Sequence, residues 1–304
     1  MIGYEKIKTK ARVFQQMTGL PLKAFRKLLP TFKKAYEQEQ ETEEEIRVKP
    51  RQRKKGGGRK GKLGSEADKL VFILFYFKFY PIQEVQGFFF GISQSQVNYW
   101  VHYLTPILNE ALGYEKQLPA RKTRQIKQVL AECPDLEFII DGTQRPIQRP
   151  KNKKRQRDCY SGKKRRHTIK NNVISQKGKK KIRGLSPTVP GKMHDKKLAD
   201  EQELEFPPDT HLWQDTGFQG YHPPNVTIHQ PFKKPKGGQL SPAQKEHNKL
   251  VSKERVEVEH SIGGVKIFRI VRDIYRNHRQ DFDDLIMETA CGLFNLRLDF
   301  STVS

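Results

Sequence analysis

The stretch Arg255-Val-Glu-Val-Glu-His-Ser-Ile-Gly-Gly-Val-Lys266 places one carboxylate, Glu259, between two cations. Arg255 precedes Glu259 by four residues and Lys266 follows it by seven, so on one helix all three side chains project from the same face. Two readings stay open here: Glu259 could simply pair with Arg255 on a surface helix, and Glu257 is a competing acid two residues away. An acid-bearing helix this late in the chain, after a strand-rich region, predicts an α/β fold with a mixed sheet.

Two aspartates upstream each follow a short apolar run, in Phe138-Ile-Ile-Asp141-Gly142 and in Leu212-Trp-Gln-Asp215-Thr-Gly217. A carboxylate at the end of a central strand is costly to bury unless it is paired or bound to a metal. Gly142 would let a ligand or another backbone approach closely. Asp141, Asp215 and Glu259 together predict a site for two Mg²⁺ ions about 3.5–4 Å apart. Taken singly, Asp141 could begin a turn and Asp215 could cap the next segment.

The charge of the chain points to an anionic partner. Lys and Arg total 58 among 304 residues against 34 Asp and Glu, a net charge of +24, which favours nucleic acids first and anionic membrane surfaces second. The cysteines Cys133, Cys159 and Cys291 form no CxxC pair, so neither a zinc knuckle nor a disulfide framework is supported, and a reducing compartment fits. The longest apolar run, Leu70 to Phe77, is far below the ~20 residues that span a bilayer. We therefore expect no membrane insertion.

The first part of the chain divides by composition. Residues 1–46 predict a helical segment, with Pro21 and Pro30 as interruptions. Residues 47–63 contain nine Lys or Arg, four Gly and no acid, which is typical of a flexible linker. This linker could track phosphates or could be a solvated tether, and charge alone does not separate the two.

Residues 64–115 predict a helix-turn-helix domain. We expect helices over Ser65–Tyr80 and Ile82–Phe90, a turn at Gly91, and a third helix opened by the capping box Ser93-Gln-Ser-Gln96. That helix has an apolar face and an opposite face carrying three amides, Gln94, Gln96 and Asn98. Amide side chains suit adenine edges in the major groove. The alternative is a small helical packing or dimerisation domain.

Residues 116–134 are expected to be a connector, and residues 135–300 the catalytic domain. Strands are predicted over Leu136–Gly142, Thr168–Ser175, Lys181–Pro187, His211–Asp215 and Asn225–Pro231. Helices are predicted to start near His194, to run from about Ser241 to Ile270, and to close the chain from Phe282 to Leu296. Gly263 and Gly264 weaken the second half of the long helix.

Several blocks together carry a family resemblance over roughly residues 135–300. They are Asp141-Gly-Thr, Tyr160-Ser-Gly-Lys-Lys-Arg-Arg-His167-Thr, Gly191-Lys-Met-His194-Asp195, Asp215-Thr-Gly-Phe-Gln-Gly220, Pro231-Phe-Lys-Lys-Pro-Lys-Gly-Gly, and Arg255 with Glu259 and Lys266. The chain resembles the DDE transposases of bacterial insertion sequences, in the branch also described as DDE superfamily endonucleases. The helix-turn-helix resembles the domain that usually precedes this core. The signature often has a tyrosine where this chain has Ser252.

The resemblance implies a ribonuclease H-like mixed-sheet catalytic core preceded by an all-α helix-turn-helix domain. It implies that Asp141, on the first strand, Asp215, on the fourth, and Glu259, on a late helix, are catalytic and bind Mg²⁺, for which Mn²⁺ may substitute. Arg255 and Lys266 would contact DNA near the scissile phosphate. We interpret the basic turn Lys163, Lys164 and Arg165 as further phosphate contacts, although an exposed hairpin would look the same. His194 and Asp195 match a family pair, for which a helix N-cap at Asp195 is the simple explanation.

The expected function follows from that resemblance. The protein would be a transposase of the bacterial cytoplasm, associated with the nucleoid, that binds double-stranded DNA at terminal inverted repeats and at target sites. Mg²⁺-dependent strand cleavage and strand transfer at two ends would require a homodimer or larger complex on DNA. Two alternatives remain at this point: a non-catalytic DNA-binding relative, domesticated or decayed, and a metal-dependent endonuclease that cuts without joining.

Overall fold

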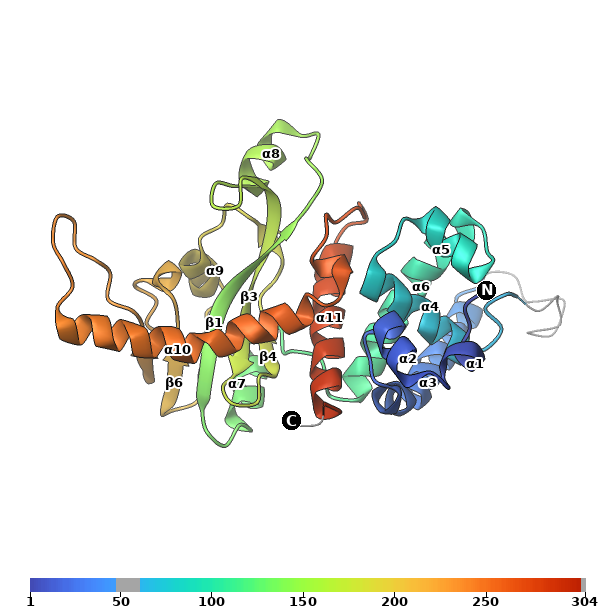
Figure 1. The fold of residues 1–304 in the computed structure, drawn as a ribbon, viewed down its shortest axis with the longest axis horizontal. Coiled ribbons are helices and arrows are strands. Elements are labelled where there is room, and N and C mark those ends of the chain that lie inside the picture. The colour runs from blue at the N-terminus through green and yellow to red at the C-terminus, as the bar shows by residue number, and fades with distance from the viewer. Residues whose placement is uncertain (48–60, 302–304) are drawn as a thin grey trace. The chain divides into compact units, whose positions relative to one another are not determined.

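The computed structural model describes residues 1–47 and 61–301, so the linker expected over 47–63 lies almost entirely outside the described residues. The chain folds into two compact units, whose elements are drawn in Figure 1. Unit 1 comprises Met1–Leu118, Ile267–Val271 and Leu285–Ser304, and unit 2 comprises Pro119–Lys266 and Arg272–Asp284. The domain boundaries expected at 46, 63, 115 and 134 stay predictions, because compactness alone does not establish which segments fold independently.

Unit 1 begins with the helices α1 (Tyr4–Ile7), α2 (Ala11–Thr18) and α3 (Leu22–Glu45). Their buried faces meet through aromatic rings, with Phe14 and Phe25 packed edge to face at 5.0 Å between ring centroids. The helical prediction for this segment is confirmed, but the interruption expected at Pro30 is wrong, because Pro30 lies inside α3. Pro30 and Arg26, whose carbonyl loses its usual amide partner, are both exposed. Water can therefore satisfy that carbonyl and lower the cost of the proline.

The three helices predicted for the helix-turn-helix are confirmed as α4 (Glu66–Phe79), α5 (Gln83–Phe90) and α6 (Gln94–Tyr114). Gly91 ends α5 in the left-handed region, with φ of +68°. Ser93 and Gln96 form the expected capping box at the start of α6. The apolar face of α6 is buried, as predicted, at Val97, Val101, Leu104 and Leu108. The pattern of caps and apolar spacing was therefore sufficient to locate these helices.

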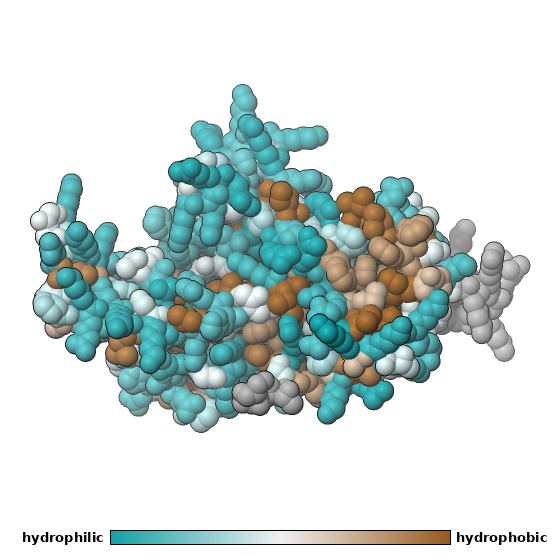
Figure 2. Space-filling model, viewed as in Figure 1, coloured by the Kyte–Doolittle hydropathy of each residue, from teal (hydrophilic) through white to brown (hydrophobic). Residues whose placement is uncertain are grey.

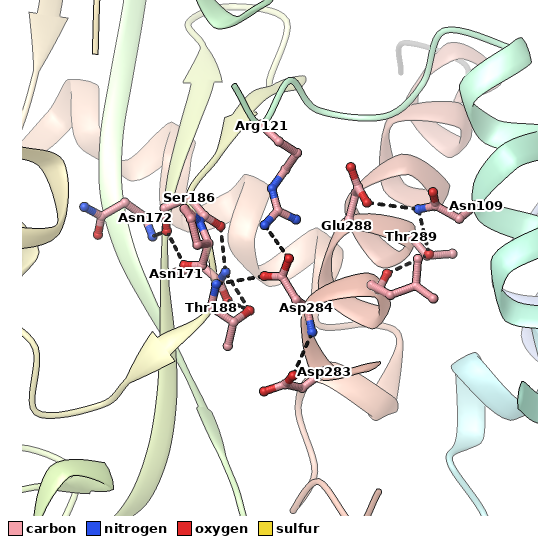
Figure 3. A network of polar contacts seen from close by, with 12 residues as sticks. Asn109, Arg121, Asn171, Asn172, Ser186, Thr188, Asp283, Asp284, Glu288 and Thr289 are labelled. Carbon is pink, nitrogen blue, oxygen red and sulfur yellow. Dashed lines mark hydrogen bonds and ion pairs between the residues drawn. The ribbon is translucent and has the colours of Figure 1, made fainter. Parts of the chain in front are cut away.

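The closing helix α11 (Phe282–Asp299) starts where predicted and extends three residues further. Most of it belongs to unit 1, where Asn109 on α6 donates to the Thr289 hydroxyl at 3.0 Å and to the Glu288 carboxylate at 3.3 Å (Figure 3). These two bonds join α6 and α11, which lie 180 residues apart in the chain.

Unit 2 is built on a mixed sheet with the strand order β2-β3-β1-β6-β7, and with β4 and β5 also paired to β3. The strands are β1 (Glu137–Pro146), β2 (Tyr160–Ser161), β3 (Arg166–Gln176), β4 (Ile182–Leu185), β5 (Val189–Pro190), β6 (Thr210–Trp213) and β7 (Val226–His229). β1 is antiparallel to β3 but parallel to β6. All five predicted strands are present, although β1 continues four residues past Gly142 because its pairing with β3 continues to Pro146.

Each face of the sheet has its own apolar cluster. Phe138 and Ile140 belong to a cluster with α7 (Thr123–Ala131), whereas Ile139 packs with Trp213 and with α10 (Pro242–Val265) on the other face. This alternation follows from the two-residue period of a strand. The segment expected to be only a connector therefore contains α7, which buries part of the core. The long helix ends at Val265, earlier than Ile270, directly after the two glycines that disfavour helix.

Two short helices complete unit 2: α8 (Lys153–Cys159), after β1, and α9 (Asp195–Glu201), before β6. Hydrophilic side chains gather over the end of this unit that carries α8 (Figure 2). The start of α11 also belongs to unit 2, where Asp284 accepts from the Thr188 amide and from Arg121 (Figure 3). Within the described residues, every helix is too short or too polar to cross a membrane.

Candidate active site

The register of the sheet brings two of the predicted acids to one place. Ile139 on β1 pairs with Trp213 on the parallel strand β6. Asp141 and Asp215 each lie two residues further along, so both emerge at the same edge of the β1–β6 pair. Asp215 follows β6 and accepts from the Gly217 amide at 2.7 Å, capping a short 3-10 helix over Thr216–Phe218. The capping interpretation of Asp215 is thus correct, and it coexists with the expected placement beside Asp141.

Arg255 on α10 connects these two aspartates. Its Nη2 atom lies 3.8 Å from Asp141 Oδ1 and 3.8 Å from Asp215 Oδ2. All three side chains are largely buried, with exposed fractions of 16%, 18% and 25% for Arg255, Asp141 and Asp215. One cation shared by two carboxylates shows that this position favours positive charge.

Glu257 and Glu259 have different surroundings on α10. Glu257 accepts a hydrogen bond from the backbone amide of Gly178 at 2.7 Å, in the turn after β3. Glu259 is exposed and lines the same cavity as Asp141 and Asp215. The helix is held on the sheet by Val251, Val258 and Ile262, which are buried against β1 and β6. Glu259 therefore remains the third acid of the candidate site.

The three acids line a cavity of about 850 Å³ whose walls also carry cations. Lys163 and Lys164, from the turn between β2 and β3, and Lys266, at the C-cap of α10, lie in these walls, and their contact with phosphates stays a prediction. Arg166 and Arg272 line it as well and were not singled out from the sequence. Arg165 is exposed in the left-handed region, with φ of +50°, and is outside the cavity lining. A cavity lined by both carboxylates and lysines suits a phosphodiester bound beside a cation.

Burial and neighbouring charges shift the pKa of two groups in this cavity. Burial raises the pKa of Asp141 to about 6; the Arg255 cation opposes this rise and the Asp215 carboxylate adds to it. Burial also lowers the pKa of the Lys266 ammonium, and the nearby Lys164 cation lowers it further, whereas Asp141 raises it. Both groups therefore lie where an added charge of opposite sign would be stabilising.

Asp195 is a fourth acid in the cavity wall. The helix N-cap expected at Asp195 is wrong: His194 occupies the N-cap position and Asp195 is the first residue of α9. The space created by Gly142 is also filled differently from the expectation, since the Asp195 side chain, not a backbone, approaches it. The two glycines that follow Asp141 and Asp215 indicated in the sequence that another group comes close to the backbone there. They did not identify that group as Asp195.

Within the described residues, no group of three or more His, Cys, Asp or Glu side chains converges closely enough to hold one metal ion. The donor set nevertheless fits a hard divalent cation, because carboxylate oxygens are the ligands that Mg²⁺ and Mn²⁺ prefer. The shared contact of Asp141 and Asp215 with a guanidinium shows that they jointly bind positive charge. Asp195, in the same cavity wall, adds a further carboxylate, whose Oδ1 atom lies 2.9 Å from Lys170 Nζ.

The amides predicted to read bases belong to unit 1. Gln94, Gln96 and Asn98 are all exposed at the start of α6. Gln94 and Asn98 donate to the Oε1 atom of Gln83 on α5, at 2.5 and 3.4 Å. Gln96 accepts from the Ser93 amide at 3.1 Å as part of the capping box. Gln83 was missed by the sequence reasoning, because only the fold shows that α5 and α6 bring these side chains together.

Two family models and one named relative match the chain. A family model described as DDE superfamily endonuclease matches residues 140–295, and one described as helix-turn-helix of DDE superfamily endonuclease matches residues 61–113. The chain is 29% identical over 290 residues to a protein of Microchaete diplosiphon named probable transposase for insertion sequence element IS702, covering 95% of each chain. No solved structure matches the chain.

Proposed function

Because the chain belongs to the DDE superfamily endonucleases, we propose that it is a transposase that cuts the ends of an insertion sequence and joins them to target DNA. The observation that carries this proposal is a single cavity lined by both acids and lysines. The acids are Asp141, Asp215 and Glu259, and the lysines are Lys163, Lys164 and Lys266. The mixed sheet, with β1 antiparallel to β3 and parallel to β6, supports a ribonuclease H-like core.

In this proposal Asp141, Asp215 and Glu259 hold Mg²⁺, for which Mn²⁺ can substitute. The chemistry that the bound ions supply is activation of the attacking oxygen and neutralisation of the leaving oxygen. Lys266, Lys163 and Lys164 bind the phosphates on either side of the scissile bond, and Arg255 moves from the aspartates to the DNA near that bond. The burial of Asp141 and Arg255 keeps bulk water from screening these charges.

The reaction proceeds in two in-line displacements. In the first, a water oxygen attacks phosphorus, the bond to the 3′ oxygen breaks, and the element end is left with a 3′-hydroxyl. In the second, that hydroxyl attacks a phosphorus of target DNA and the bond to a target 3′ oxygen breaks. Both ends have to be processed together, so we expect a homodimer or larger complex on DNA. The helix-turn-helix would hold the terminal inverted repeats, partly through Gln94, Gln96 and Asn98.

The test uses a labelled duplex that carries the DNA flanking the coding sequence of this chain, with supercoiled plasmid as target and Mg²⁺ present. We expect cleavage and joining by the wild type and a loss of at least about a hundredfold in Asp141→Asn. Asp209→Asn is the matched control, because Asp209 is exposed and its left-handed backbone, with φ of +60°, accepts asparagine. Cleavage without joining would indicate a simple endonuclease, and binding without cleavage a non-catalytic relative.

A further inference from the structure

The Asp195 carboxylate lies directly against the two backbone segments that carry Asp141 and Asp215. A Cβ atom at Gly142 would overlap Asp195 Oδ1, and a Cβ atom at Gly217 would lie 2.9 Å from Asp215 Oδ1 and 3.0 Å from Asp195 Oδ2. Gly142 follows Asp141 by one residue and Gly217 follows Asp215 by two. Both glycines therefore make room for the same side chain.

A buried lysine and an amide hold Asp195 in this position. Lys170 on β3 has a side chain only 7% exposed, and its Nζ atom lies 2.9 Å from Asp195 Oδ1. The same Nζ donates to the Met193 carbonyl at 2.7 Å. Asn172, also on β3, donates to the Asp195 carbonyl at 2.9 Å. The side chain and the backbone of Asp195 are thus both fixed from the strand that pairs with β1.

This arrangement groups four carboxylates in one cavity wall. Asp195 lines the same cavity as Asp141, Asp215 and Glu259, and lysines and arginines line it as well. A buried ion pair such as Lys170–Asp195 recovers little more than its desolvation cost. Asp195 Oδ1 is paired with Lys170 Nζ, whereas the Oδ2 atom lies toward Gly217, beside Asp215. Oδ2 can therefore serve as a further oxygen ligand for a divalent cation.

Building on the proposed function, we propose that Asp195 is a fourth carboxylate of the divalent-cation site and that Lys170 is its positioning residue. Asp195 contributes an oxygen to the cation directly or through an ordered water. The two glycines and the two polar side chains of β3 are the parts of the fold that bring this oxygen beside Asp141 and Asp215.

The experiment measures Mn²⁺ affinity of the full chain without DNA, by calorimetry and by the electron paramagnetic resonance signal of free Mn²⁺. Asp195→Asn is expected to weaken Mn²⁺ binding about 10–100-fold, the range typical for residues that support a metal site. Asp200→Asn is the matched control, since Asp200 lies on the same helix, is 45% exposed and pairs with Lys196. It should bind Mn²⁺ like the wild type.

A double variant separates a cation-binding role from a structural one. Asp195→Asn alone leaves Lys170 buried without its partner, whereas Lys170→Met with Asp195→Asn removes both charges. We expect the double variant to fold and still bind Mn²⁺ weakly. Wild-type affinity in either the single or the double variant would overturn the role of Asp195. Asp141→Asn reports on the proposed function itself: if it too binds Mn²⁺ normally, the whole metal assignment fails, not only that of Asp195.

Discussion

At the scale of single residues, Asp141 shows how burial in the fold changes the pKa of a carboxyl group. Its carboxylate is only 18% exposed, and its nearest cation, Arg255, lies 3.8 Å away, beyond hydrogen-bond distance. Burial therefore dominates and raises its pKa from 3.8 to about 6. At neutral pH the chain holds a carboxylate that has lost much of its hydration and that a bound cation would stabilise.

This shift predicts a pH-dependent cost to stability in the metal-free protein. The folded state binds the proton of Asp141 more tightly than the unfolded chain, so the free energy of unfolding falls as pH rises from 3.8 to about 6. Asp141→Asn mimics the neutral form and should raise the free energy of unfolding at pH 7.5 by up to about 3 kcal/mol. Near pH 4 the gain should almost vanish.

Urea unfolding in the presence of a chelator, at pH 4 and at pH 7.5, measures this difference. Asp209→Asn again serves as the control, since it removes the same charge from an exposed position. A gain of the same size at both pH values, or a loss at pH 7.5, would contradict the assigned environment of Asp141.

At the scale of elements, the start of α6 has a structural role in capping the helix and, in the proposed function, a role in reading DNA. The Ser93 hydroxyl accepts from the Gln96 amide at 3.3 Å, and the Gln96 side chain accepts from the Ser93 amide at 3.1 Å. These bonds satisfy two backbone donors that a helix end would otherwise leave open. The exposed amides Gln94 and Asn98 lie in the same first turns, so the cap also fixes where they point.

Ser93→Ala should therefore lower the free energy of unfolding by about 1 kcal/mol. It should also weaken binding to the terminal repeat, because the amide-bearing turn frays. Ser95→Ala is the matched control, two residues along and equally exposed, and should change both quantities little. Thermal unfolding and fluorescence anisotropy with labelled duplex give the two measurements. Equal effects of the two substitutions would count against the cap.

At the scale of the whole molecule, the net charge of +24 is distributed unevenly. Residues 149–166 contain ten Lys or Arg and a single acid. They include α8 and the turn after β2, and Lys163, Lys164 and Arg166 from this run line the cavity of the candidate site. Cations placed this close to the proposed triad should neutralise phosphates of bound DNA.

Replacing both Lys163 and Lys164 by Gln should weaken DNA binding and reduce its dependence on salt. Each phosphate contact contributes about −0.9 to the slope of log K against log salt, so the slope should become shallower by about 2. The matched control replaces Lys127 and Lys197, which lie outside the cavity lining and pair with Glu205 and Glu201. Binding measured from 50 to 300 mM salt, about the range over which such slopes are resolved, tests the difference. An unchanged slope would place the two lysines away from DNA.

The sequence by itself determined the helices of the first unit and the five main strands, and it predicted the three acids of the candidate site. Caps such as Ser93 and Gln96, apolar periods such as that of α6, and short apolar runs ending in Asp141 and Asp215 are local signals. Local sequence signals predict the folded structure correctly wherever tertiary packing does not oppose them. Where it does, as at Pro30 inside α3 or in β1 beyond Gly142, the local prediction was wrong or too short.

Only the tertiary structure decided which side chains meet. Parallel pairing of β1 with β6 sets Asp141 beside Asp215 across 74 residues of chain. Because α10 packs on the β1–β6 pair, Glu259 lines the cavity and Glu257 accepts a hydrogen bond from the Gly178 amide. Asp195, Lys170 and Gln83 could not be chosen from the sequence, because their roles depend on partners brought close by strand register and helix packing. Such contacts span long separations, and no local pattern encodes them.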